Sequence, residues 1–83
     1  MKYTIDNPLL IDNLSFWGNA TFTGVAKNTF KTLFFYKNGL FHNDVGAAIV
    51  WLNGKKEWWI DGVLYGCNDD FTDESWMMFL LFK

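Results

Sequence analysis

The middle of the chain alternates between apolar runs and short polar breaks. The runs, at 33–37, 47–52 and 56–61, are rich in aromatic and β-branched residues, which is typical of β-strands. In the last run, alternation places Trp58 on one side of an extended segment and Trp59 on the other. This pattern predicts a sheet that is covered mainly on one side.

Asn-Gly or Asp-Gly pairs lie in or between these runs, at Asn38-Gly39, Asn53-Gly54 and Asp61-Gly62. Such pairs favour two-residue type I′ turns, because both central residues need a positive φ that Asn, Asp and Gly adopt at little cost. Strands joined by such turns predict an antiparallel β-meander of about five to seven strands, and hence a mainly β (α+β) fold.

Two stretches of this region, YKNGLFH at 36–42 and WIDGVLY at 59–65, share one skeleton at a constant offset (59 − 36 = 23). No reactive side chain recurs between them, so we interpret the repeat as a structural hairpin unit. The repeated region spans 18–66 and Gly24 indicates an earlier copy in it. The structural positions are Tyr36, Asn38, Gly39, His42, Gly46, Asn53, Gly54, Trp59, Asp61, Gly62 and Tyr65.

The two ends of the chain differ from the middle, within what we expect to be a single domain over 1–83. In the N-terminal segment, 1–17, the stretch DNPLLIDNL predicts a short helix with Asn7 as N-cap. A second helix is predicted over 70–83, where Asp70 and Thr72 are candidate N-caps and acidic residues follow in the first turn. Apolar residues lie all round this helix, which predicts burial on more than one side.

Composition narrows the classes of function. The chain has 83 residues, a net charge of −2 and seven cationic residues, all of them Lys. Without Arg it lacks the usual side chain for reading bases and phosphates. Cys67 is the only cysteine, which excludes an internal disulfide and a cysteine-based zinc site. The longest apolar run, Trp76 to Phe82, is far shorter than the roughly 20 residues that span a bilayer, and we expect a cytoplasmic protein without membrane contact.

Candidate chemistry is sparse. His42 is the only histidine, and no nucleophile can be paired with it and nearby Asp44, so we interpret it as hydrogen-bonded to a turn. The stretch NDDFTDE at 68–74 lacks the spacing and the Gly of an EF-hand calcium loop. The tryptophans at 51, 58 and 59 accompany a Lys-rich segment and are interpreted as core rather than as a stacking surface for bases. We therefore predict no enzyme, metal site or cofactor.

The stretch NGLFHNDVGAAIVWLNGKKEWWIDG resembles MORN repeats, whose unit is a β-hairpin of about this period. It is still more similar to a variant common in small proteins of tailed bacteriophages, NG…H…GPA…NG…W…NG, although Ala47 replaces the usual Pro and Tyr65 the second His. The likeness covers roughly 33–66. It implies a scaffold for protein association and a phage-encoded protein that disables a host protein, including one of antiviral defence.

The C-terminal third is the expected partner surface, because residues 57–82 hold six acids and no base. We predict a non-enzymatic module that inhibits or redirects a host protein with a basic surface. Self-association through the apolar helix is the alternative, and a single-strand nucleic-acid binder using Lys55, Lys56 and Trp58 is a third possibility. The predicted partner-binding residues are Asp69, Asp70, Asp73, Glu74, Trp76, Phe79 and Leu80.

Overall fold

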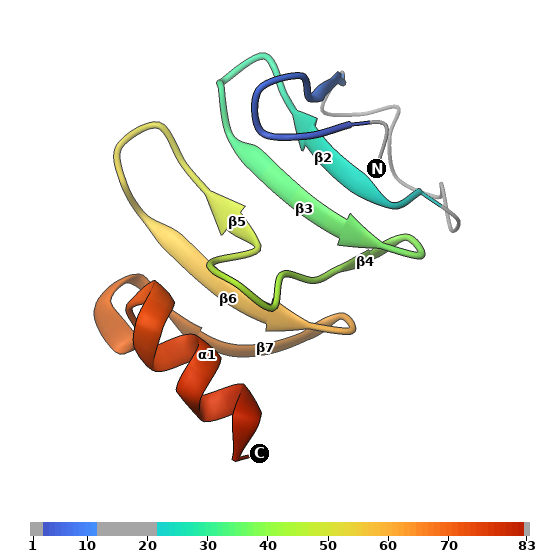
Figure 1. Ribbon diagram of the computed structural model, residues 1–83. Helices are drawn as coiled ribbons and strands as arrows, with labels where there is room; N and C mark the ends of the chain where they lie inside the picture. Colours follow the sequence, from blue (N-terminus) through green and yellow to red (C-terminus); the bar gives the residue numbers. More distant parts are fainter. Residues whose placement is uncertain (1–2, 12–21, 83) are drawn as a thin grey trace.

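The computed structural model describes residues 3–11 and 22–82, in which one seven-stranded sheet is followed by one α-helix (Figure 1). The strands are β1 (Leu9–Leu10), β2 (Gly24–Lys27), β3 (Leu33–Lys37), β4 (Leu40–Phe41), β5 (Ile49–Val50), β6 (Lys56–Ile60) and β7 (Val63–Cys67). A 3₁₀ helix, η1 (Asn68–Asp70), leads to the helix α1 (Asp73–Leu81). The predicted mainly β fold with a C-terminal helix is confirmed.

The sheet follows the chain as a meander, in the order β1-β2-β3-β5-β6-β7, with β4 also paired to β3. β4 pairs with the end of β3 at Tyr36 and Lys37, whereas β5 pairs with its beginning at Leu33 and Phe34. β4 and β5 therefore share one edge of β3, and the loop 43–47 leaves the sheet between them. The predicted strand over 47–52 is correspondingly shorter in the structure.

The N-terminal segment differs from its prediction. Leu9 and Leu10 form β1, which runs parallel to β2 with Leu9 opposite Ala26. The expected short helix is wrong for these residues, because hydrogen bonding to a neighbouring strand overrides a local capping signal. The sheet is therefore mixed, although the other pairings of the described strands are antiparallel. Residues 12–14 of the predicted N-terminal helix, and residues 18–21 of the repeat region, lie outside the described residues.

Two of the three predicted type I′ turns are present. Asn38-Gly39 has φ of 52° and 78°, and Asp61-Gly62 has φ of 49° and 79°. At the third pair only Gly54 has a positive φ, and its N–H bonds to the carbonyl of Trp51. This is the pattern of a three-residue loop, in which a type I turn is followed by a left-handed glycine. The prediction of a type I′ turn at Asn53-Gly54 is wrong.

The C-terminal helix is shorter than its predicted range of 70–83. Phe71 and Thr72 are extended, so Asp70 belongs to η1 and the helix begins at Asp73. Thr72 is the N-cap, and its Oγ1 accepts a hydrogen bond from the Ser75 N–H at 3.1 Å. The helix ends at Leu81, and residue 83 lies outside the described residues.

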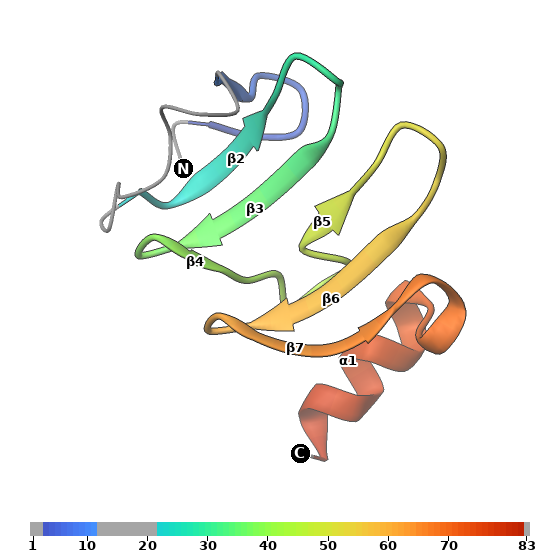
Figure 2. The same ribbon diagram turned by 180° about the vertical axis from the view of Figure 1, so that it is seen from behind.

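The two faces of the sheet are covered differently. On the helix face, α1 lies across the β6–β7 end of the sheet (Figures 1 and 2). There Trp58 and Trp76 are both fully buried, with ring centroids 5.5 Å apart. On the aromatic face, the rings of Phe22, Tyr36, Phe41 and Trp59 form a half-buried row with centroids 5.0–5.7 Å apart. The alternation of Trp58 and Trp59 seen in the sequence thus separates two ring clusters.

Candidate functional site

The repeated skeleton forms two hairpins whose turns dock in the same way. The N–H groups of Asn38 and Gly39 donate to the Thr23 Oγ1 and the Phe22 carbonyl, at 2.9 and 2.8 Å. In the second hairpin, the N–H groups of Asp61 and Gly62 donate to the His42 Nδ1 and the Phe41 carbonyl, at 3.1 and 2.9 Å. A Phe and the polar residue after it therefore hold the turn of the next hairpin along the chain.

His42 makes the hydrogen bond to a turn that was expected from the sequence. Because its Nδ1 accepts the Asp61 N–H, the neutral ring carries its proton on Nε2. The Asp61 Oδ1 lies 3.2 Å from the same Nδ1, so a protonated ring would form an ion pair there. Nearby Asp44 is exposed and makes no hydrogen bond or ion pair with this ring, so the pairing of His42 with Asp44 that was considered from the sequence is not formed.

The four predicted acidic residues lie around the N-terminal end of α1. All are exposed, and two of them have structural neighbours. The Asp70 Oδ2 accepts the Cys67 N–H at 2.9 Å, and Asp73 lies beside Gly46, where an added Cβ would meet its Oδ1 at 3.2 Å. Asp69 and Glu74 have no hydrogen bond or ion pair within the described chain. These two carboxylates therefore have no hydrogen-bonding role in the described fold.

The helix behind the acids is only partly covered. Trp76 and Leu80 face the core, and Trp76 is fully buried, with its Nε1 donating to the Asn43 carbonyl at 2.7 Å. The predicted partner surface is therefore wrong at Trp76, because a large ring fills the gap between helix and sheet. Phe79 is 38% exposed, and the other exposed apolar side chains of this end are Met77, Met78, Leu81 and Phe82.

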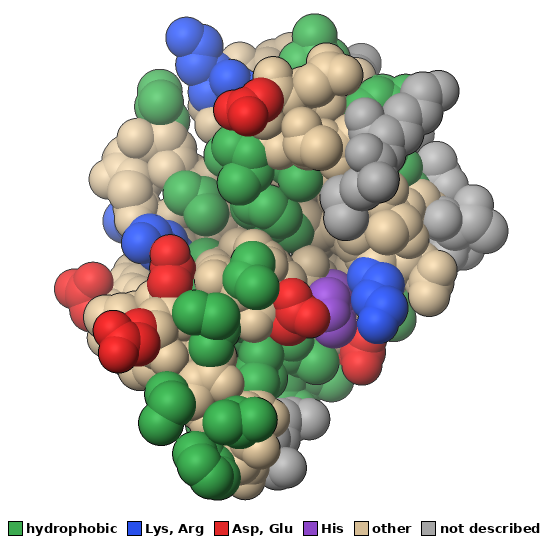
Figure 3. Space-filling model, in the orientation of Figure 1, with side chains coloured by type: hydrophobic (Ala, Val, Ile, Leu, Met, Phe, Trp, Pro, Cys, Tyr) green, Lys and Arg blue, Asp and Glu red, His purple; other side chains and the backbone are tan. Residues whose placement is uncertain are grey.

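The expected burial of α1 on more than one side is not met by the described part of this chain. Figure 3 shows the resulting apolar patch over the lower end of the molecule, where α1 runs. We call this patch together with the acids the C-terminal surface; its members are Asp69, Asp70, Asp73, Glu74, Met77, Met78, Phe79, Leu81 and Phe82. The sequence showed the apolar composition, but it did not show which sides of the helix the sheet would leave open.

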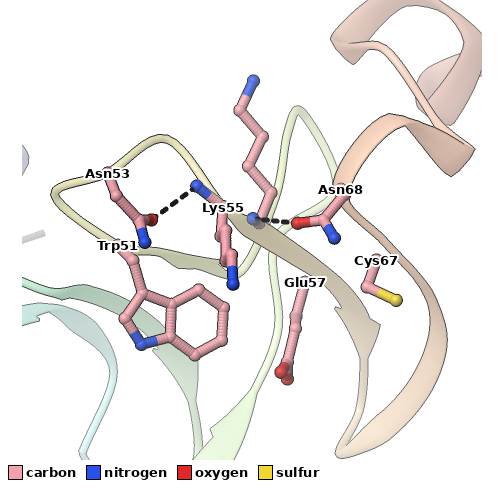
Figure 4. Close-up of a pocket in the computed structure, with 7 residues that line it drawn as sticks. Trp51, Asn53, Lys55, Glu57, Cys67 and Asn68 are labelled. Atoms are coloured by element: carbon pink, nitrogen blue, oxygen red, sulfur yellow. Dashed lines mark hydrogen bonds between the residues drawn. The ribbon is translucent and has the colours of Figure 1, made fainter.

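A second surface feature is a cleft of about 420 Å³ between the β5–β6 hairpin and the end of β7. Its lining includes the indole of Trp51, Lys55, Glu57 and two asparagines (Figure 4). The tryptophan that was expected to join the lysines, Trp58, is fully buried and cannot stack on a base. Trp51 is half-buried in the cleft instead, which the sequence pattern did not distinguish.

No group of three or more His, Cys, Asp or Glu side chains is placed to hold a metal ion among residues 3–11 and 22–82. Burial raises the pKa of the Tyr36 phenol on the aromatic face. Chemically, the groups that these two surfaces offer to a binding partner are apolar side chains, carboxylates and hydrogen-bond donors.

The chain matches no known protein-family model, curated protein or solved structure. The MORN-like likeness of 33–66 therefore stays a prediction from the sequence. No described helix is long and apolar enough to cross a membrane.

Proposed function

We propose that this protein is a non-enzymatic module that binds another protein through its C-terminal surface. The observation that carries the proposal is the exposure of five large apolar side chains on and just after one short helix, from 38% for Phe79 to 77% for Phe82. Each is worth about 1.5–3 kcal/mol when fully buried, so their exposure is costly for a domain of this size. A contiguous apolar patch of this kind marks an interaction site.

The charges beside the patch favour a basic partner. Asp69 and Glu74 are exposed and without ion pairs in the described chain, and residues 57–82 contain no base to balance them. Carboxylates at the rim of an apolar contact steer a partner with Lys or Arg around its groove and set its register. The likeness of residues 33–66 to small phage proteins supports a bacterial host protein, inhibited or redirected by the contact, as that partner.

Matched substitutions test the apolar half of this surface. Leu81 and Phe82 are 73% and 77% exposed on the C-terminal surface, whereas Leu52 and Phe30 are 74% and 71% exposed elsewhere. We expect wild type to enrich one host protein from bacterial lysate, measured by quantitative mass spectrometry. The pair Leu81→Ser and Phe82→Ser loses it, and the control pair Leu52→Ser and Phe30→Ser retains it. Equal capture by both double variants would overturn the proposal.

The acidic half is tested with the purified partner. Asp69→Lys with Glu74→Lys is expected to weaken binding by calorimetry roughly ten- to a hundredfold, because two favourable charge contacts become repulsive. Asp44→Lys with Asp6→Lys makes the same change of charge at exposed positions elsewhere and is expected to have little effect. A partner lost equally by both pairs would indicate net charge, not this surface, as the determinant.

Self-association is the second candidate, favoured by one feature of α1. Residues 75–82 carry no charged side chain, so two copies of this stretch can approach each other without charge repulsion. Light scattering over a range of concentrations separates the two functions. If the wild type is a dimer and Leu81→Ser with Phe82→Ser makes it a monomer, the partner of this surface is a second copy of the chain. A wild-type monomer at every concentration excludes self-association.

A further inference from the structure

The cleft beside the β5–β6 hairpin has the features of a ligand site that is separate from the C-terminal surface. Its volume of about 420 Å³ lies within the range of roughly 300–1,000 Å³ typical of small-molecule sites. Three segments build it: the turn after β5, the first residues of β6, and the junction of β7 with η1. Because β6 pairs with both neighbours, the cleft rests on hydrogen-bonded strands.

Trp51 supplies an unused aromatic surface. Among the four tryptophans that the structure describes, Trp58, Trp59 and Trp76 each pack against another ring, and Trp51 does not. Its indole is half-buried in the wall of the cleft (Figure 4). A fixed ring with one open side is the platform on which planar ligands stack.

Two asparagines present hydrogen-bond donors to the cleft, Asn53 beside the Trp51 ring and Asn68 on the opposite side, next to Cys67 (Figure 4). The Asn53 Oδ1 accepts the N–H of Lys55 at 3.0 Å, and the Asn68 Oδ1 accepts the N–H of Lys56 at 3.2 Å (Figure 4). With each oxygen held by the backbone, each amide NH₂ group remains without a partner in the described chain. The orientation of both amides is thus set before any ligand arrives.

The charges of the cleft favour an anion. Lys55 and Lys56 both line it, and neither has an ion pair within the described residues, although the Lys56 Nζ lies 6.0 Å from the centroid of the Trp58 ring. Figure 4 shows Lys55 extending on the same side of the hairpin as Trp51. Glu57 is the one carboxylate in the lining, and its Oε1 accepts the Trp59 Nε1–H at 2.8 Å. Two ammonium groups, two amide NH₂ groups and one partly engaged carboxylate leave an excess of donors.

We propose that this cleft binds a nucleoside phosphate, with the base stacked on Trp51 and the phosphate held by Lys55 and Lys56. The ring accounts for a planar group, and the ammonium and amide donors account for an anion beside it. The same chemistry occurs in a free nucleotide and in a single-stranded nucleic acid. The proposal does not depend on the C-terminal surface, because no residue is shared between the two.

Titration of ¹⁵N-labelled protein with AMP tests the site, followed through the indole N–H signal of Trp51. We expect this signal to shift saturably, and adenosine and ribose 5-phosphate to bind at least about tenfold more weakly, since each lacks one of the two contacts. Trp51→Leu is expected to weaken AMP binding roughly tenfold or more, the range seen when a stacking ring is removed. Ribose 5-phosphate binding as tightly as AMP would overturn the proposal, as would an unmoved Trp51 signal.

Further variants separate the site from general charge effects. Lys55→Gln with Lys56→Gln is expected to abolish phosphate-dependent binding, whereas Lys37→Gln with Lys27→Gln, outside the cleft, leaves it unchanged. Glu57→Gln is expected to strengthen AMP binding severalfold by removing the one negative charge. Equal weakening by both lysine pairs would overturn the site. All variants are first compared by their ¹H–¹⁵N spectra, so that an unfolded variant is not scored.

An oligonucleotide arm identifies the source of the nucleoside phosphate. Oligo(dA) binding much more tightly than AMP, with affinity that falls steeply as salt rises, assigns the cleft to single-stranded nucleic acid. Equal or weaker binding of the oligonucleotide assigns it to a free nucleotide. Both outcomes uphold the proposed ligand chemistry, which fails if neither ligand shifts Trp51.

Discussion

The two hairpins β3–β4 and β6–β7 have the same turn and different surroundings. Their turn residues agree within 3° in φ, and both turns dock on a Phe carbonyl and the side chain after it. Yet Phe35, at the position equivalent to Trp58 (58 − 23 = 35), is half-buried, whereas Trp58 is fully buried. Local sequence therefore sets the hairpin, and the next element along the chain sets the packing.

The segment after each hairpin explains this difference. After β4 the chain leaves the sheet as the loop 43–47 and returns as β5, so no helix crosses Phe35 in the described chain. After β7 the chain forms η1 and α1, which places Phe71 and Trp76 against Trp58. A repeat in the sequence thus predicts a repeated conformation without predicting a repeated contribution to stability.

The largest expected effect contrasts the two equivalent core positions. Trp58→Ala removes a fully buried ring and its Nε1 hydrogen bond to the Asn68 carbonyl, and we expect a loss of about 3–5 kcal/mol in the free energy of unfolding. Phe35→Ala, at a half-buried ring, is expected to lose about half as much. Urea denaturation measures both. Similar losses at the two positions would contradict the contrast.

The next effect tests whether the two turns are equivalent. Gly39→Ala and Gly62→Ala each place a Cβ at φ near 78°, and each is expected to lower the free energy of unfolding by about 1–2 kcal/mol. At Gly62 the new Cβ also meets the Leu40 side chain at 3.2 Å, which adds a steric cost to the backbone cost. Gly54→Ala, at φ +90° with nothing within 4 Å, is the control for the backbone contribution alone.

A smaller effect distinguishes the side chains that hold the turns. Thr23→Val removes the acceptor for the Asn38 N–H, and His42→Phe removes the acceptor for the Asp61 N–H. Each is expected to lower stability by about 1 kcal/mol. Hydrogen exchange shows which turn each substitution loosens. The amide N–H of Asp61 should exchange faster in His42→Phe, and the amide N–H of Asn38 should exchange faster in Thr23→Val. Faster exchange at both turns in either variant would mean that the hairpins open together.

The smallest effect depends on pH and involves only the first hairpin. Burial raises the pKa of the Tyr36 phenol above its ordinary value of 10.0, whereas the equivalent Trp59 does not titrate. The unfolded chain therefore ionises first. The contribution of the neutral Tyr36 side chain to the stability of the fold is complete below pH 10.0. It is lost as the pH rises through the raised pKa. Tyr36→Phe should flatten the stability profile there, and an absorbance titration should show one tyrosine ionising late.

Short-range features of the fold could be predicted from the sequence. The bounds of β3, the two type I′ turns and the Thr72 cap each depend on residues within a few positions of one another. The prediction of a type I′ turn at Asn53-Gly54 was wrong, because Asn-Gly also suits a three-residue loop. The parallel pairing of β1 could not be predicted, since each of its residues pairs with a residue of β2 that lies 17 positions along the chain (26 − 9 = 17).

The candidate site was predicted less completely than the fold. Acidic residues and an apolar helix were identified, but Trp76 was assigned to the surface and Trp51 to the core. The burial of Trp76 depends on where α1 crosses the sheet. That crossing is fixed by a hydrogen bond between Trp76 and Asn43, whose separation of 33 residues leaves no periodic signal. Which side chains of the helix are exposed therefore depends on long-range contacts and cannot be predicted from the local sequence.

Because Trp76 bonds to Asn43, 33 residues earlier in the chain, α1 can join the sheet only after the strands between them have been synthesised. Both hairpins rely on local contacts and can form as the chain leaves the ribosome. Trp58, however, is not covered until α1 has been made, so the growing chain carries an open aromatic cluster until that point. A nascent chain in that condition is a substrate for chaperones and prone to association with its neighbours. The formation of α1 is therefore the step that ends this vulnerable period.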